Sequence, residues 1–127
     1  MNSIVIHTIQ GGIVKGSTGD FRPNQEKFHI MLENGEVSAM SVQKLKAVFF
    51  VKDLTGDSDR EDSYEDTVPG GGRKVQVTFR DGEVIVGFTT AYSSQRLGWF
   101  LVPADAGSNN LRIFVVNAAI AGVEFLS

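Results

Sequence analysis

Short apolar segments alternate with polar turns along most of the chain, and no long stretch shows the 3.6-residue period of an amphipathic helix. Asp81-Gly82 separates two such segments, and Asp-Gly between apolar runs is a strong hairpin signal. Single helical turns are expected at 43–46 and 118–121. The predicted strands are 4–9, 12–19, 27–32, 36–42, 47–52, 75–80, 83–92, 98–103, 111–117 and 122–126. The pattern therefore predicts an all-β fold.

The second half of the chain repeats the first. Residues 4–32 align without a gap with residues 75–103, at a constant shift of 71 positions (75 − 4). Aligned residues of the same kind include Gly16 and Gly87, Phe21 and Tyr92, and Phe28 and Trp99. Further on, residues 45–51 align with residues 120–126 at a shift of 75 (120 − 45), so the second copy is four residues longer. A duplicated unit is therefore expected.

Five short strands with one helical turn before the last are typical of a small SH3-like or Sm-like barrel. We expect two tandem five-stranded barrels packed together, the first at 1–52 and the second at 73–127. Residues 53–72 are predicted to be a flexible linker, because they are polar and end in three glycines. This linker has one Arg and seven Asp or Glu, a charge of −6, while the two repeats carry +2 and +1. The net charge of −3 therefore comes from the linker.

Strand alternation leaves more apolar side chains than two small barrels can bury. Phe28 and Ile30 share one predicted face with Leu32, and His29 and Met31 share the other. In the second copy, Trp99 and Leu101 alternate with Phe100 and Val102 in the same way. The surplus comprises Met31, Phe49, Val51, Val86, Phe100 and Val102. Two interpretations stay open: the repeats bury these side chains against each other, or they form a surface for a partner or a second copy.

The turns after the second and seventh predicted strands each combine an aromatic residue with an arginine. Such loops are where small barrels bind ligands, although ordinary turn chemistry also accounts for them. Together with the aromatic positions on the strands, they give the candidate partner-binding residues Phe21, Arg22, Phe49, Tyr92, Arg96, Trp99 and Phe100. We expect binding energy to concentrate in a few such anchors.

Catalytic and metal-binding chemistry is not expected. The chain has no Cys, and its two histidines, His7 and His29, lie on predicted strands without a nucleophile–base–orienter pattern. The acidic run 57–62 resembles a calcium loop, but Asp62 stands where such a loop has Gly. No metal, no cofactor and no enzymatic activity are therefore predicted.

Electrostatics argue against nucleic acid as the partner, because nearly neutral repeats and a −6 linker offer few charges for phosphate groups. Residues 20–24 resemble the Asp and Asn turn with which Sm proteins hold a loop and touch bases. The second copy has Ala91 and Gln95 there, and the Arg-Gly pair of the last Sm strand is missing. An Sm-like RNA-binding protein and a sensor of a small anionic nucleotide stay as alternatives. The sensor would differ from PilZ domains, which bind cyclic di-GMP with paired arginines that this chain lacks.

Three segments resemble recurrent segments of an uncharacterised bacterial domain family: residues 45–53, 72–83 and 100–119. The likeness covers almost the whole chain apart from the acidic linker. It implies a domain of unknown function from signalling-rich bacteria, often found near regulatory proteins, and it supplies no catalytic residues.

These observations predict a non-catalytic protein-binding adaptor or regulatory module in bacterial cytoplasmic signalling or cell organisation. The partner is a protein such as a signalling regulator, and a homodimer stays open. No apolar stretch approaches the roughly 18 residues of a membrane span, and residues 1–4 do not begin a secretory signal. A cytoplasmic protein without membrane contact is therefore expected.

Overall fold

The computed structural model describes residues 1–54, 72–105 and 107–126, so most of the predicted linker lies outside the described residues. The first half contains β1 (Asn2–Thr8), β2 (Ile13–Thr18), β3 (Lys27–Leu32), β4 (Val37–Ser41) and β5 (Leu45–Val51). The second half contains β6 (Arg73–Phe79), β7 (Val84–Thr89), β8 (Gly98–Pro103), β9 (Asn110–Val116) and β10 (Ile120–Phe125). Short 3-10 turns, Val42–Lys44 and Asn117–Ala119, precede the last strand of each half. The all-β prediction is confirmed.

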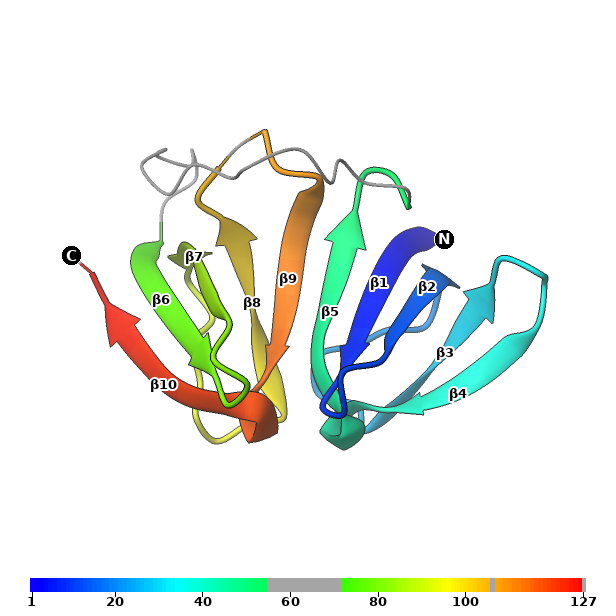
Figure 1. Ribbon diagram of the computed structural model, residues 1–127, viewed down its shortest axis with the longest axis horizontal. Helices are drawn as coiled ribbons and strands as arrows, with labels where there is room; N and C mark the ends of the chain where they lie inside the picture. Colours follow the sequence, from blue (N-terminus) through cyan, green and yellow to red (C-terminus); the bar gives the residue numbers. More distant parts are fainter. Residues whose placement is uncertain (55–71, 106, 127) are drawn as a thin grey trace.

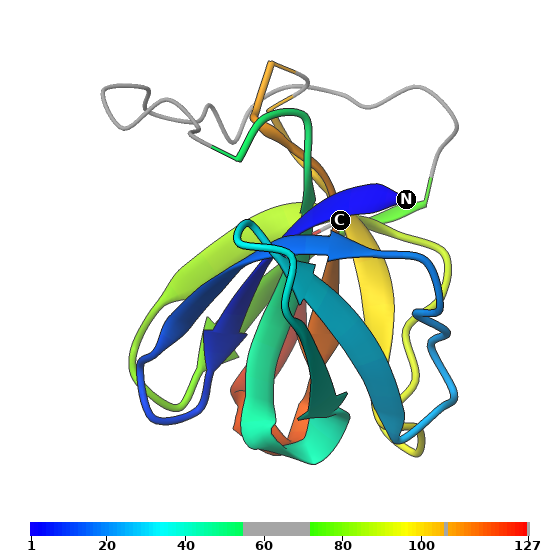
Figure 2. The ribbon, with the colours of Figure 1, turned by 90° about the vertical axis from the view of Figure 1, so that its right-hand side faces the viewer.

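All ten strands belong to one antiparallel sheet, in the order β10-β6-β7-β8-β9-β5-β1-β2-β3-β4. The sheet is continuous through β9 and β5 and does not close into a barrel, so the expected arrangement of two tandem barrels packed together is not shown. Each half keeps the same internal order, with its fifth strand beside its first. Figure 1 shows the two halves side by side, with β4 and β10 at opposite ends. Viewed from the β4 end, the sheet is strongly curled (Figure 2).

The curl forms two hydrophobic cores. The first-half core consists of Ile4, Ile6, Phe28, Ile30, Val42, Leu45, Val48, Phe50, Phe114 and Val116. The second-half core consists of Ala47, Phe49, Val51, Val75, Val77, Phe79, Trp99, Leu101, Ile113, Val115 and Ala119. The predicted faces of β3 and β8 are confirmed, since Phe28, Ile30, Trp99 and Leu101 are buried while Met31 and Val102 are exposed.

β5 is buried along its whole length because its two faces lie in different cores. Val48 and Phe50 point into the first-half core, and Ala47, Phe49 and Val51 point into the second-half core. The interpretation that the two halves bury surplus apolar side chains against each other is therefore confirmed for Phe49 and Val51.

β9 mirrors this arrangement from the other side of the junction. Ile113 and Val115 lie in the core of their own half, whereas Phe114 and Val116 lie in the core of the first half. The two central strands pair antiparallel, with Val48 opposite Phe114 and Phe49 opposite Ile113. Each half is therefore completed by one strand of the other.

Two glycine pairs show how closely the halves repeat. Gly11 and Gly82 both adopt φ = +93° in the first turn of their halves, a conformation that favours glycine. Gly16 and Gly87 lie where neighbouring strands come close, and a Cβ would stand 2.2 Å from the Met31 carbonyl oxygen and 2.3 Å from that of Val102. Within the described ranges, no helix is both long and apolar enough to cross a membrane.

Candidate binding surfaces

The structure does not bring the predicted partner-binding residues together in one place. Phe21 and Phe100 meet in an aromatic cluster on the first-half core, with ring centroids 5.9 Å apart. Phe21 also makes edge contacts with Phe28, Phe50 and Phe114, at 5.0, 5.4 and 5.1 Å. These two predicted residues are only partly buried, so part of each remains at the surface.

Tyr92 and Trp99 meet in the second half, with ring centroids 5.1 Å apart. Trp99 is only 2% exposed, and its indole N–H donates to the Asn117 side-chain oxygen at 3.0 Å. Tyr92 is 42% exposed and also contacts Phe125 at 5.5 Å. Tyr92 is therefore the accessible member of this pair.

Arg22 and Arg96 are exposed on the loops where the sequence placed them. Near Arg22, the Asp20 carboxylate accepts the His29 backbone N–H at 2.9 Å and lies 2.7 Å from His29 Nδ1. These contacts lower the pKa of Asp20, and the backbone N–H has a larger effect than the ring. The Arg96 carbonyl accepts the Asn117 side-chain N–H at 2.9 Å, which ties its loop to the end of β9.

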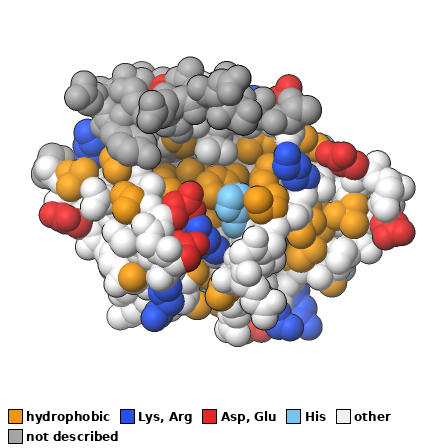
Figure 3. All heavy atoms as spheres, viewed as in Figure 1, with side chains coloured by type: hydrophobic (Ala, Val, Ile, Leu, Met, Phe, Trp, Pro, Cys, Tyr) orange, Lys and Arg blue, Asp and Glu red, His pale blue; other side chains and the backbone are white. Residues whose placement is uncertain are grey.

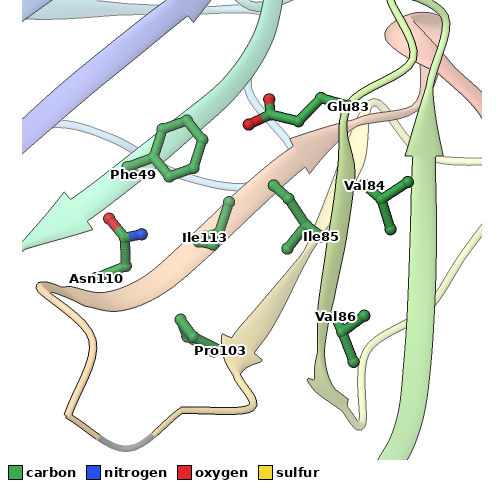
Figure 4. Close-up of a pocket in the computed structure, with 8 residues that line it drawn as sticks. All are labelled: Phe49, Glu83, Val84, Ile85, Val86, Pro103, Asn110 and Ile113. Carbon is green, nitrogen blue, oxygen red and sulfur yellow. The ribbon is translucent and has the colours of Figure 1, made fainter. Parts of the chain in front are cut away.

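Phe49 lies apart from the other predicted residues, at the floor of a groove between the halves. The interhalf groove is lined by Phe49, Glu83, Val84, Ile85, Val86, Pro103, Asn110 and Ile113, and has a volume of about 140 Å³. Figure 4 shows Phe49 from β5, Ile113 from β9 and Ile85 from β7 around the same space. Phe49 is 7% exposed, so it packs in the second-half core and leaves little of its surface in the groove.

A charged cluster flanks the groove, and sequence reasoning did not find it. The Lys46 ammonium, from β5, lies 2.8 Å from an Asp81 carboxylate oxygen and also contacts the Glu83 carboxylate. Both carboxylates come from the turn between β6 and β7 of the other half. Figure 3 shows acidic, basic and histidine side chains beside hydrophobic atoms at the centre of this face. A lone Lys within the apolar run of 45–51 was the available signal, because a buried ammonium needs a partner.

Burial and charge shift the titration of this cluster. Burial alone would lower the pKa of Lys46, but the hydrogen bonds to Asp81 and Glu83 outweigh it and raise the pKa. The hydrogen bond from Lys46 lowers the pKa of Asp81, and the hydrogen bond from the Glu83 backbone N–H lowers it to a smaller extent. Burial lowers the pKa of nearby His7, whose ring lies 4.6 Å from that of Phe49.

No described part of the chain brings three His, Asp or Glu side chains together in a way that would hold a metal ion. The surfaces around the predicted residues are apolar and aromatic, with charged side chains beside them. The roles of Phe21, Arg22, Phe49, Tyr92, Arg96, Trp99 and Phe100 in partner binding stay predictions.

The fold is an all-β domain in which two halves of equivalent strand order share one sheet. The chain belongs to a family of unknown function, DUF6982, whose model matches residues 1–127. This membership agrees with the resemblance to an uncharacterised domain. No curated protein and no solved structure matches the chain.

Proposed function

We propose that the protein is a non-catalytic protein-binding module, an adaptor or regulator in bacterial cytoplasmic signalling or cell organisation. The interhalf groove carries this proposal. Its volume of about 140 Å³ is close to the roughly 150 Å³ of an engineered apolar cavity that binds benzene. It therefore has room for one apolar side chain of a partner.

The groove combines mostly apolar lining residues with polar groups that would add specificity. Glu83 and Asn110 supply polar groups at its edge, and Lys46 fixes the position of Glu83. An apolar centre with a polar rim is the common anatomy of protein interfaces. We also propose that each half derives from an SH3-like or Sm-like barrel unit, an origin supported by the equivalent strand order of the halves.

The test is affinity capture from extract of the source cells, with and without nuclease, followed by quantitative mass spectrometry. The bait is compared with Val84→Glu, which adds a charge at the groove. The matched control is Val102→Glu, because Val84 and Val102 are 38% and 39% exposed and Val102 does not line the groove.

We expect one protein to be recovered with and without nuclease, equally with the control, and at least about tenfold less with Val84→Glu, since a buried charge in an interface costs several kcal/mol. Equal recovery by all three baits would contradict a role for the groove. A catch that vanishes with nuclease would favour the RNA-binding alternative. Thermal stabilisation by a small anionic nucleotide, lost in Arg22→Ala or Arg96→Ala, would favour the sensor alternative.

A further inference from the structure

The outer edge of β10 is free of a neighbouring strand among the described residues, although the equivalent edge of β5 is occupied. Both strands are the fifth of their half, and each pairs with the first strand of that half. On its other side β5 pairs with β9, whereas β10 ends the sheet. A free edge strand presents unpaired backbone N–H and C=O groups to any extended chain of suitable sequence.

The aromatic surface beside β10 repeats the one that receives β9. Phe21 contacts Phe28 at 5.0 Å and 82°, and the equivalent Tyr92 contacts Trp99 at 5.1 Å and 80°. Phe21 also contacts Phe50 at 5.4 Å, and Tyr92 contacts Phe125 at 5.5 Å. The second half therefore has the same aromatic group, without the strand that covers it in the first half.

At the occupied edge, β9 supplies two side chains to this aromatic group. Phe114 lies 5.1 Å from Phe21, and the Arg112 guanidinium lies 4.5 Å from the centre of Phe50. At the free edge, Tyr92 remains 42% exposed and forms an open hollow with Phe125 and Arg73. The Arg73 guanidinium already lies 4.0 Å from the centre of Phe125, so the missing contact is the aromatic one.

Glu124 indicates which residue of an added strand would lie beside its aromatic residue. The pairings with β1 and β6 make Glu124 equivalent to Phe49, and Val123 equivalent to Val48. At the occupied edge, Phe49 is opposite Ile113 and Val48 is opposite Phe114. A strand added to β10 in the same way would place one residue opposite Glu124 and the next opposite Val123. The first is best basic, and the second is best aromatic.

A second copy of this chain fits poorly, because its own free edge lacks these residues. The pairing of β3 with β4 and of β8 with β9 makes Ser38 equivalent to Ile113, and Ala39 equivalent to Phe114. β4 would thus bring a hydroxyl opposite Glu124 and a methyl group to the aromatic hollow. The charge of Glu124 on an edge strand also opposes association of like sheets.

From these observations we infer that β10 is a strand-addition site for an extended segment of a partner protein, in which a Lys or Arg immediately precedes an aromatic residue. The segment runs antiparallel to β10, its basic side chain pairs with Glu124, and its aromatic ring packs against Tyr92 and Phe125. The inference rests on the proposed role in protein binding, but it uses a surface separate from the interhalf groove.

The probe is a blocked synthetic peptide, Asn-Leu-Arg-Lys-Phe-Val-Val, which is the β9 sequence with Lys in place of Ile113. Two control peptides carry Glu instead of that Lys, or Ser instead of that Phe. Binding to the whole protein is measured by calorimetry, alongside the variants Glu124→Lys and Tyr92→Ser. Val37→Ser, a change on the exposed edge strand β4, is the matched control.

We expect the Lys peptide to bind about tenfold more tightly than the Glu peptide, since opposite charges on paired strands attract and like charges repel. Glu124→Lys reverses this preference, Tyr92→Ser and the Ser peptide abolish binding, and Val37→Ser changes nothing. No binding, or equal binding of the Lys and Glu peptides, overturns the inference. Assembly of the free protein at micromolar concentration overturns it as well, because a second copy would then be the occupant.

The proposals for the interhalf groove and for the edge of β10 can be refuted separately. Val84→Glu leaves peptide binding intact if the two surfaces are distinct. Loss of the cellular partner in Val84→Glu together with no peptide preference would refute the edge site alone. A reversible peptide preference with undiminished cellular capture by Val84→Glu would refute the groove alone.

Discussion

β5 and β10 have the same place in their halves but opposite surroundings. All seven residues of β5 are buried, and none of the residues of β10 is. Both follow a 3-10 turn and pair with the first strand of their half. The difference comes from β9, which covers the outer edge of β5 and brings the second half with it. A strand's burial here is decided by its neighbour across the junction, and the side chains have diverged accordingly, with Phe49 in β5 and Glu124 in β10.

The largest expected effect comes from giving β5 the charge that β10 tolerates. Phe49→Asp places a carboxylate among the apolar side chains of the second-half core. We expect a loss of at least about 4 kcal/mol in the free energy of unfolding, enough to unfold many domains of this size. Urea denaturation followed by Trp99 fluorescence measures it.

The matched control is Glu124→Asp, which introduces the same residue at the equivalent position of the free edge. Its free energy of unfolding should stay within about 0.5 kcal/mol of the native value. If the two aspartates were equally well tolerated, β5 would not be the shared strand of two cores.

Phe114→Ala tests the contribution of β9 to the first half. The ring is fully buried and contacts Phe21 and Phe100, so its removal leaves a cavity. A loss of about 3–5 kcal/mol is expected from chemical denaturation. Leu111→Ala, on the same strand but 54% exposed, should cost far less. Similar losses for both would mean that β9 does not insert into the first-half core.

The glycine pair sharpens the comparison, because there the halves are alike. Gly16→Ala and Gly87→Ala should each cost about 1–3 kcal/mol, since the new methyl group would meet the carbonyl oxygen of Met31 or Val102 and the strands would have to separate. Gly122→Ala is the control, because no atom lies within 4 Å of its would-be Cβ. Thermal denaturation of the three variants would refute the equivalence of the halves if Gly16→Ala and Gly87→Ala differed widely.

The smallest effect concerns pH and the junction. Burial in the folded protein lowers the pKa of His7 below 6.5, so folding favours the neutral ring. This stability is fully present above pH 6.5 and is lost as the pH falls through the pKa of the folded state. The melting temperature of His7→Gln should therefore depend less on pH below 6.5 than that of the native protein. An identical pH profile for both proteins would remove His7 from the account.

The repeat and the approximate positions of all ten described strands could be predicted from the sequence, because alternation and turn glycines are local signals. Gly16 and Gly87 fixed the alignment, and the faces of Phe28 and Trp99 followed from it. The continuous sheet could not be predicted, because pairing between β5 and β9 joins segments about sixty residues apart and leaves no local signature.

The candidate sites were foreseen only in part, for a related reason. Tyr92 lies at the predicted loop and stays accessible, whereas Phe49 and Trp99 have their partners inside the chain. Lys46 and Glu83 meet across the two halves, so their contact depends on the same unpredicted junction. Sequence patterns indicated which side chains were surplus, and the tertiary structure decided which of them remained exposed.

Amide hydrogen exchange of the whole protein, with and without the Lys peptide, tests the central comparison most directly. The account predicts slow exchange along β5 and β9, fast exchange at the outward-facing amides of β10, and protection of β10 when the peptide is added. Equal protection of β5 and β10 in the free protein, or protection by the peptide anywhere except β10, would contradict it.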